Sequence, residues 1–200
     1  MANAPIKLND GHTIPWLGFG TGTALFKKDV TESITNAIAA GFTHLDGAQM
    51  YDNEESLGAG IAASGKPRAE LFVTTKFGPL SAGHSVRDVL VGALGKLKMD
   101  YVDLFLIHSP VDHPRDGLKG IWKEMEGLKT EGLARSIGVS NFRVKDLETI
   151  IAGATVFPAV NQIELHPHLY AETKSLLDFH AKHGIVTVSY SGLSPLFRTE

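Results

Sequence analysis

The 200-residue sequence contains no cysteine. This absence excludes disulfide bonds, zinc–thiolate sites, iron–sulfur clusters and thiol nucleophiles. The sequence also has no apolar run near the ~18 residues that span a bilayer, and its start lacks the basic and apolar regions of a secretory signal. We therefore expect a reducing, cytoplasmic location and no membrane partner.

Strong charge of either sign is also lacking. The chain has 19 Lys and Arg against 22 Asp and Glu, a net charge of -3, which argues against nucleic acid as a partner. Hydrophobic residues make up 43% of the sequence, enough for one large core at this length. No linker or low-complexity segment interrupts the chain, so we expect a single domain over residues 1–200.

Short apolar runs alternate with longer amphipathic segments. A hairpin is predicted at about 6–14, with its turn at Asp10 and Gly11. Seven strands are then predicted to start near residues 17, 43, 71, 101, 134, 159 and 185. Six helices are predicted between them, over 30–40, 54–63, 85–97, 118–130, 144–152 and 173–183. Strict alternation at a period of about 28 residues predicts βα units and a parallel sheet.

Two architectures fit this alternation, a doubly wound sheet and a (β/α) barrel. A doubly wound nucleotide-binding domain usually opens with G-x-G-x-x-G after its first strand. Here Gly18 and Gly20 match that pattern, but Thr23 stands where its third glycine belongs. The sequence is therefore interpreted as an α/β protein with a TIM-type (β/α) barrel, with seven strands visible and the barrel incomplete at the C-terminal side.

Polar side chains follow six consecutive predicted strands, at the ends where a barrel carries its active site. They are Asp46 with Tyr51, Lys76, His108, Ser140 with Asn141, Asn161 with Gln162, and Tyr190 with Ser191. Any one of them has an ordinary structural explanation, such as a solvated lysine or a hydrogen-bonded core histidine. Four titratable groups at three successive strand ends instead indicate a catalytic site.

These four groups suit the reduction of a carbonyl. A phenol with a pKa of about 10 is a poor proton donor at neutral pH, and a neighbouring ammonium lowers that pKa. Lys76 can supply the ammonium, Asp46 can keep it charged, and His108 can donate a hydrogen bond to a substrate oxygen. Tyr51 would then protonate the oxygen while hydride reaches the carbon. Hydride requires a nicotinamide or flavin.

Five motifs, in order along the chain, resemble the aldo-keto reductase family. They lie at 45–54, 73–76, 104–110, 137–142 and 160–167, and the resemblance extends over about 6–193. It implies a catalytic tetrad of Asp46, Tyr51, Lys76 and His108. It also implies NADPH-dependent reduction of an aldehyde or ketone, with Tyr51 as the proton donor and a small carbonyl compound as the substrate.

The resemblance further implies an extended NADPH along the barrel rim. The implied cofactor-binding residues are Gly22, Thr23, Asp46, Ser140, Asn141, Gln162, Tyr190 and Ser191. Among them, Ser140, Asn141 and Gln162 would hold the nicotinamide carboxamide, and Tyr190 would stack on the ring. Trp16, Trp122 and Phe77 have weaker claims, because each is as easily a packing residue.

The sequence departs from the family pattern in two places. Gly47 stands where family members usually carry Thr or Ser, which removes a hydroxyl. Family members also continue beyond Tyr190 through an eighth strand, two helices and a loop, which include the residues that hold the 2′-phosphate. We therefore expect weakened NADPH binding. The open barrel edge leaves three interpretations: a fragment of a longer protein, a homo-oligomer in which chains cover each other's edge, or a distorted barrel.

Two other functions stay open beside the reductase. A redox-inactive relative could use the tetrad for proton transfer in isomerisation, dehydration or cyclisation, and an open barrel could be a non-catalytic fragment or scaffold. A metal site at His180 and His183 is disfavoured, because no carboxylate completes a ligand set there. No metal is expected.

Overall fold

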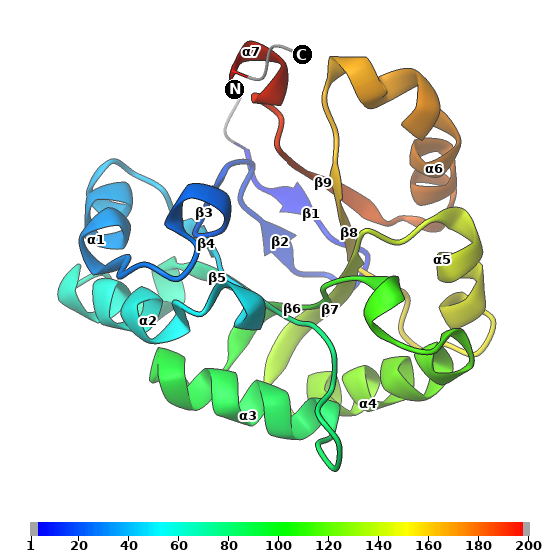
Figure 1. The fold of residues 1–200 in the computed structure, drawn as a ribbon, viewed down its shortest axis with the longest axis horizontal. Coiled ribbons are helices and arrows are strands. Elements are labelled where there is room, and N and C mark those ends of the chain that lie inside the picture. Colours follow the sequence, from blue (N-terminus) through cyan, green and yellow to red (C-terminus); the bar gives the residue numbers. More distant parts are fainter. Residues whose placement is uncertain (1–3, 198–200) are drawn as a thin grey trace.

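The computed structural model describes residues 4–197, so the outermost residues of the predicted domain (1–3 and 198–200) lie outside it. Within the described range, seven parallel strands form one curled sheet with helices around its outer face (Figure 1). The predicted α/β architecture, an incomplete (β/α) barrel, is confirmed. The assignment of residues 1–200 to a single domain stays a prediction.

The strands lie side by side in the order in which they occur along the chain. They are β3 (Gly18–Gly20), β4 (His44–Asp46), β5 (Phe72–Phe77), β6 (Val102–Ile107), β7 (Ala134–Ser140), β8 (Val160–Glu164) and β9 (Val186–Tyr190). Each pairs in parallel with its neighbour. Among residues 4–197, β3 and β9 form the two edges of the sheet and do not pair with each other.

Within residues 4–197, six helices connect successive strands and a seventh follows the last strand. They are α1 (Thr31–Ala39), α2 (Glu54–Ala63), α3 (Val86–Leu97), α4 (Leu118–Thr130), α5 (Val144–Ile151), α6 (Tyr170–His183) and α7 (Ser194–Phe197). The sequence did not predict α7, and it placed the start of α6 at residue 173. That start was wrong because a 3-10 turn over Pro167–Leu169 leads directly into α6.

Single 3-10 turns were also missed, because so short a segment has no hydrophobic periodicity. They are η1 (Thr23–Leu25), η2 (Gln49–Tyr51), η3 (Arg68–Glu70), η4 (Pro110–Asp112), η5 (Arg115–Gly117) and η6 (Pro167–Leu169). All of them except η3 lie between the end of a strand and the next helix, at the end of the barrel that carries the predicted site. No helix in the described part of the chain is long and apolar enough to cross a membrane.

The N-terminal hairpin lies across the centre of the curled sheet (Figure 1). β1 (Ile6–Lys7) pairs antiparallel with β2 (Thr13–Ile14), and the turn between them contains Gly11 at a φ of +92°. Leu8 and Ile14 are buried in a small core inside the barrel, together with apolar side chains of β6 and β8. The hairpin therefore closes the end of the barrel at which the strands begin.

A second, larger core lies between the sheet and the surrounding helices. Trp122 and Phe77 belong to it, with exposures of 1% and 0%. Trp122 Nε1 donates a hydrogen bond to the carbonyl of Val156 at 2.9 Å. Trp16 precedes β3 and so lies at the opposite end of the barrel from the predicted site. Phe77 is the last residue of β5, but its ring lies in this outer core, 5.2 Å from that of Phe105. The positions of the three aromatic residues therefore do not support their weaker claims to cofactor binding.

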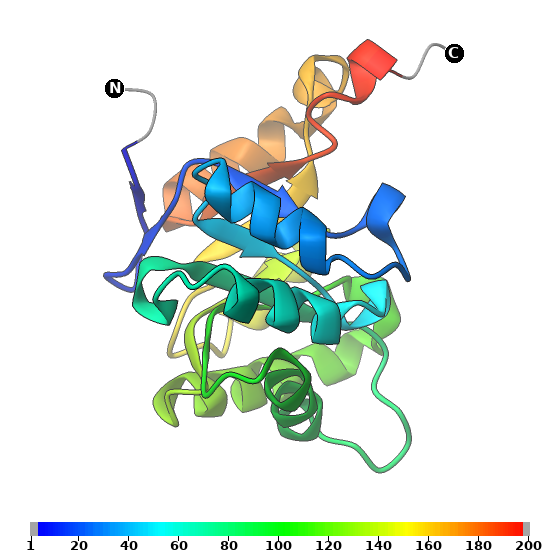
Figure 2. The same cartoon turned by 90° about the vertical axis from the view of Figure 1, so that its left-hand side faces the viewer.

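Helix α2 fits between α1 and α3 because two of its glycines carry no side chain (Figure 2). A Cβ at Gly58 would lie 2.5 Å from the carbonyl oxygen of Leu97 in α3, and one at Gly60 would lie 2.7 Å from that of Thr31 in α1. Backbone atoms cannot swing aside as a flexible side chain can. The close approach of these helices therefore requires glycine at both positions.

Replacing Gly58 with alanine should destabilise the protein by about 2 kcal/mol or more, because the new methyl group overlaps backbone atoms of α3. Gly92 in α3 is the matched control, since a Cβ there meets nothing within 4 Å. Gly92→Ala should stabilise the protein by ~0.5–1 kcal/mol through helix propensity. Urea unfolding of both variants measures the difference. A Gly58→Ala variant as stable as the wild type would contradict the packing described here.

Candidate active site

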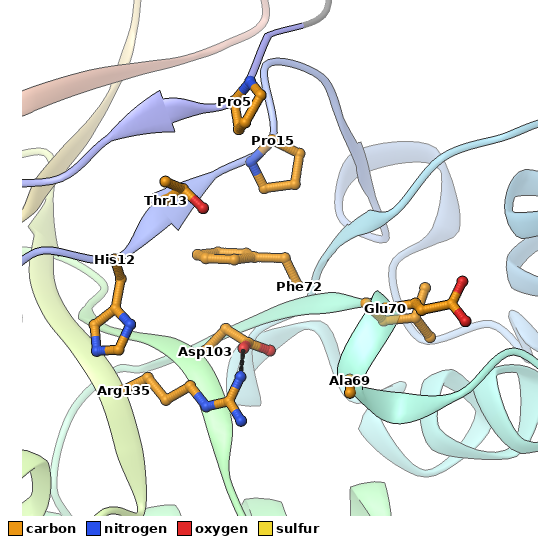
Figure 3. A pocket seen from close by; sticks show the side chains of 10 residues that line it. Pro5, His12, Thr13, Pro15, Ala69, Glu70, Phe72, Asp103 and Arg135 are labelled. Atoms are coloured by element: carbon orange, nitrogen blue, oxygen red, sulfur yellow. Dashed lines mark hydrogen bonds and ion pairs between the residues drawn. The ribbon is translucent and has the colours of Figure 1, made fainter.

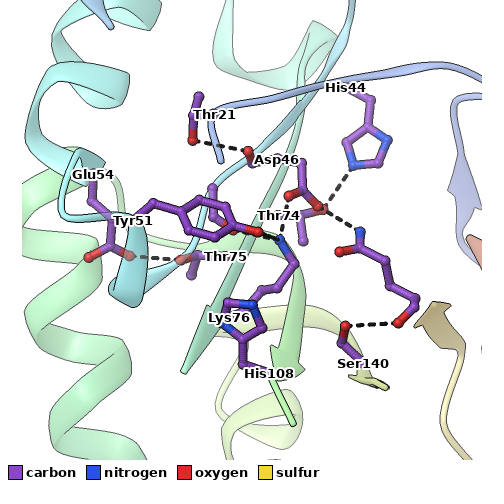
Figure 4. A network of polar contacts seen from close by, with 12 residues as sticks. Thr21, His44, Asp46, Tyr51, Glu54, Thr74, Thr75, Lys76, His108 and Ser140 are labelled. Carbon is purple, nitrogen blue, oxygen red and sulfur yellow. Dashed lines mark hydrogen bonds and ion pairs between the residues drawn. The ribbon is translucent and has the colours of Figure 1, made fainter. Parts of the chain in front are cut away.

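The predicted tetrad residues come together where β4, β5 and β6 end (Figure 4). Asp46 is the last residue of β4, Lys76 lies near the end of β5, and His108 directly follows β6. Tyr51 ends η2, the turn between β4 and α2. Side chains alternate along a strand, and the parallel register pairs Asp46 with Thr74 and Lys76 with Leu106. Asp46 and Lys76 thereby point to the inside of the curled sheet.

Lys76 is the centre of this group. Its side chain is fully buried, and Nζ forms an ion pair with Asp46 Oδ1. Nζ also donates to the carbonyl oxygen of Gly47 at 2.9 Å and lies 3.4 Å from Tyr51 Oη. Burial by itself lowers the pKa of Lys76, but the Asp46 carboxylate and Tyr51 raise it, and the pKa lies above its ordinary value. Lys76 is therefore an ammonium at neutral pH.

His108 also packs against the Tyr51 ring. The two rings meet edge to face, with centroids 5.6 Å apart. Burial, reinforced by the positive charge of Lys76, lowers the pKa of His108 to about 4. Its imidazole is therefore neutral at pH 7 and carries one N–H donor and one acceptor nitrogen. Nδ1 is buried and has no hydrogen-bond partner among the described residues.

A line of polar side chains continues from the tetrad along the rim. Gln162 Nε2 donates to Asp46 Oδ2 at 2.8 Å, and Ser140 Oγ donates to the carbonyl of Gln162 at 2.8 Å. Asn141 Nδ2 donates to Ser140 Oγ at 3.1 Å and to the carbonyl of His108 at 3.0 Å. Tyr190 Oη donates to Asn141 Oδ1 at 2.8 Å. Four predicted cofactor residues thus form one connected set with the tetrad.

The other three predicted cofactor residues lie in turns at the same end of the barrel. Gly22 packs on the Tyr51 ring, where a Cβ would lie 2.9 Å from Cζ. Thr23 and Ser191 have φ values of +53° and +56°, and Asn141 has +62°. Left-handed backbone at non-glycine residues is costly and is concentrated at functional sites. No hydrogen bond in the described part of the chain joins the Thr23 or Ser191 side chain to the tetrad.

Several supporting residues were not predicted as site residues. Glu54, 2% exposed, accepts a hydrogen bond from Thr75 Oγ1 at 2.7 Å and pairs with Lys96 at 3.4 Å. This contact ties the start of α2, next to Tyr51, to β5, next to Lys76. Thr21 and Asn53 form a second buried contact at 3.2 Å. Glu54 and Asn53 follow Tyr51 in the motif, but sequence does not show which way their side chains turn.

Gly47 also has a role in the structure. Its amide donates to the carbonyl of Thr74 at 2.9 Å, and its carbonyl accepts the bond from Lys76 already described. A Cβ at this position would lie 2.8 Å from Leu57 Cδ2. Leu57 thus fills the space that a side chain at position 47 would need.

His180 and His183 are both held in contacts within the protein. His180 is 1% exposed, and its two ring nitrogens lie 2.9 Å from Asn161 Nδ2 and 2.8 Å from Thr187 Oγ1. His183 stacks on Phe179, with ring centroids 4.1 Å apart. In residues 4–197 no group of three or more His, Asp or Glu side chains is arranged to hold a metal ion.

A cavity of about 270 Å³ lies at the opposite end of the barrel, between the hairpin and the start of β5 (Figure 3). Asp103 projects toward it and accepts hydrogen bonds from Arg68 at 2.6 Å and Arg135 at 3.2 Å. Both guanidinium groups also lie over the Tyr101 ring. Asp103 therefore has two cationic partners beside this cavity, and the cavity is separate from the tetrad.

The described site contains a buried lysine–carboxylate pair, a tyrosine hydroxyl and a neutral histidine, at the strand ends of a (β/α) barrel. This arrangement is typical of enzymes that move a proton to or from a substrate oxygen. The sequence profile of the aldo/keto reductase family matches residues 16–200. The chain therefore belongs to the aldo-keto reductase family and, with it, to the oxidoreductases.

Individual relatives agree with this assignment. The chain is 41% identical over 197 residues to an NAD/NADP-dependent indole-3-acetaldehyde reductase of Schizosaccharomyces pombe, covering 94% of this chain and 69% of the relative. It is 41% identical over 190 residues to a methylglyoxal reductase of Yersinia pestis, covering 94% and 66%. A solved aldo/keto reductase from Brucella melitensis is 40% identical, with a TM-score of 0.87, covering 96% of this chain and 74% of that one.

The chain thus spans about two thirds of the length of these curated relatives.

Buried neutral histidines should make the protein sensitive to acid. His44 is 4% exposed, and burial lowers its pKa from 6.5 to about 4. Between these values the unfolded chain binds a proton that the folded protein does not, so stability is full above pH ~6.5 and falls as the pH drops toward ~4. His44 alone should account for about 2 kcal/mol between pH 6.5 and 4.5.

Urea unfolding at several pH values measures this loss. His44 Nε2 lies 2.9 Å from Thr74 Oγ1. His44→Gln keeps a polar group near this hydroxyl but does not titrate, so the stability of the variant should decline less steeply over the same range. Equal slopes for the wild type and His44→Gln would show that His44 is not the group responsible.

Proposed function

We propose that the protein reduces the carbonyl group of a small aldehyde or ketone, with NADPH as the reductant and Tyr51 as the proton donor. One observation carries this proposal: the Lys76 ammonium is buried between Asp46 and Tyr51 Oη, 3.4 Å from the hydroxyl. An ammonium at this place stabilises the phenolate that proton donation leaves behind. The reductase names of the relatives support the same chemistry.

The rim residues fit a nicotinamide. Its carboxamide has one acceptor oxygen and two N–H donors, and the rim offers both kinds of partner in Ser140, Asn141 and Gln162. Gly22 has no side chain, so the backbone there can approach a bound cofactor closely. Tyr190 is 38% exposed and presents an aromatic ring at the same end of the barrel. When bound, a reduced nicotinamide supplies the hydride, which no side chain can provide.

The chain's own residues would handle the proton and the developing charge. A carbonyl oxygen placed between Tyr51 and His108 accepts the Tyr51 proton as negative charge grows on it. His108, being neutral, donates one N–H to the same oxygen and so orients it. Asp46 keeps Lys76 charged, and Gln162 fixes the second Asp46 oxygen at 2.8 Å.

Two further expectations belong to this proposal. The partner is a small carbonyl compound, in line with the substrates in the relatives' names. Association of two chains along the β3 and β9 edges stays a prediction. Leu193, Leu196 and Phe197, which follow β9, are 64%, 73% and 79% exposed.

Replacing Tyr51 with phenylalanine should lower kcat by about 100-fold or more, because the general acid is lost while the ring remains. Methylglyoxal and indole-3-acetaldehyde, named for two relatives, are suitable first substrates, with turnover followed by the loss of NADPH absorbance. Tyr101→Phe is the matched control, because it removes the same atom at the opposite end of the barrel, where Tyr101 packs against Arg68 and Arg135. Full activity in Tyr51→Phe would refute the assigned role.

Cofactor binding can be measured without choosing a substrate. We expect saturable binding of NADPH. The fluorescence of NADPH itself should be recorded, because Trp16 and Trp122 lie away from the rim and are poor reporters of binding there. Gln162→Ala should weaken binding because it removes one rim amide and the contact to Asp46. A parallel titration with NADH tests the preference for the 2′-phosphate. Equal affinities for NADPH and NADH would show a nicotinamide site that does not prefer the 2′-phosphate. Binding of neither cofactor would contradict the proposed function.

A further inference from the structure

Asn53 directly precedes helix α2, but its side chain does not cap that helix. Asparagine is among the residues that best satisfy the free N–H groups at a helix start, yet no side-chain capping bond forms here. The residue is 4% exposed, and its amide faces the 21–25 segment that follows β3. Asn53 thus makes contacts with a distant part of the chain in place of the local ones that its position favours.

The Asn53 amide makes three hydrogen bonds to this segment. Nδ2 donates to the carbonyl oxygen of Thr21 at 2.9 Å and to that of Leu25 at 3.0 Å. Oδ1 accepts from Thr21 Oγ1 at 3.2 Å, and Thr21 is itself 0% exposed. Because an amide combines two donors with an acceptor, one side chain fixes both ends of the segment.

The centre of the segment is a strained residue. Thr23 has a φ of +53°, a left-handed conformation that is unfavourable for a β-branched side chain. Such a conformation persists only where the surrounding structure holds it in place. The two carbonyl groups bound by Asn53, those of Thr21 and Leu25, lie on either side of Thr23, so the amide holds the backbone around the strained residue.

The same segment is in contact with the proton donor. Gly22 packs on the Tyr51 ring, where a Cβ would lie 2.9 Å from Cζ. Just beyond the segment, the amide of Lys27 donates to the carbonyl of Tyr51 at 2.8 Å, and the Phe26 and Tyr51 rings lie 6.4 Å apart. The position of Gly22 and Thr23 therefore depends on the same contacts as the position of Tyr51.

We propose that Asn53 is a positioning residue that holds the 21–25 segment against Tyr51, so that Gly22 and Thr23 are ready for the cofactor before it binds. This inference rests on the proposed function, in which these two residues lie along the nicotinamide cofactor. Asn53 itself contacts neither cofactor nor substrate. Its effect is on preorganisation, which governs affinity by removing the cost of ordering a loop on binding.

Asn53→Ser separates positioning from stability. Serine cannot reach both carbonyl groups, so the hydrogen bonds that hold the segment are lost. It is as good a helix N-cap as asparagine and can make the capping bond that Asn53 does not make, which offsets part of the lost stability. The melting temperature should therefore fall by no more than about 5 °C. The NADPH dissociation constant should rise about tenfold, equivalent to ~1.4 kcal/mol. Amide exchange over 22–28, measured by mass spectrometry without cofactor, should become faster, because this segment loses its buried anchor.

Asn9→Ser is the matched control. Asn9 also donates its side-chain N–H to a backbone carbonyl, that of Pro158 at 2.9 Å, but at the closed end of the barrel. This variant should leave both NADPH affinity and exchange over 22–28 unchanged. If Asn53→Ser folds poorly, Thr21→Val can replace it. This variant removes the hydroxyl that contacts Asn53 Oδ1 and the carbonyl of Asp46 but keeps both Asn53 Nδ2 bonds, so it should give a smaller increase in exchange.

The outcomes separate the two proposals. If the wild type binds neither NADPH nor NADH, the proposed function fails, and the exchange experiment alone decides the role of Asn53. Unchanged exchange over 22–28 in Asn53→Ser would overturn the inference. So would an unchanged NADPH dissociation constant when the wild type binds NADPH.

Discussion

The buried ammonium of Lys76 is the constraint on which the site depends. Removing such a charge from water costs several kcal/mol unless partners surround it. Asp46, the Gly47 carbonyl and the Tyr51 hydroxyl are those partners, and they come from one strand and the turn after it. Loss of Asp46 would leave the charge uncompensated, at a cost of about 3–5 kcal/mol. The contacts that compensate the buried charge of Lys76 therefore also place it next to Tyr51, where the charge stabilises a phenolate.

Packing outside the barrel contributes to the same geometry. The segment that carries Tyr51 leads into α2, and α2 lies close to both of its neighbours because Gly58 and Gly60 leave no side chain between the helices. The Glu54–Thr75 hydrogen bond then joins the start of α2 to β5. Tyr51 is thus attached to a helix that has little freedom to shift relative to the strand that carries Lys76. The glycines buried between the outer helices and the Tyr51 hydroxyl at the rim therefore belong to one arrangement.

Most of the fold and the main members of the site could be predicted from sequence. The alternation of strands and helices is regular enough to locate every strand of the sheet, and residues at strand ends meet at one end of a barrel for topological reasons. The sequence could not show side-chain direction within loops and turns. Asn53 and Glu54 stand next to Tyr51, but their partners Thr21 and Thr75 are distant in sequence. Trp122 and Phe77 were ambiguous for a related reason, since aromatic character alone does not tell the outer face of a barrel from its rim.

The hydrogen bond between Tyr190 and Asn141 has a consequence for selectivity. Asn141 Oδ1 already accepts the Tyr190 hydroxyl at 2.8 Å, and its Nδ2 already donates to two oxygen atoms. Both Nδ2 hydrogens are thus in use, so a ligand acceptor that reaches this amide must exchange an existing hydrogen bond for a new one. Exchange yields little free energy by itself, but a ligand without a matching polar group would leave a desolvated amide or hydroxyl unpaired and be penalised. The rim would then discriminate between ligands mainly by rejecting those that cannot complete the exchange.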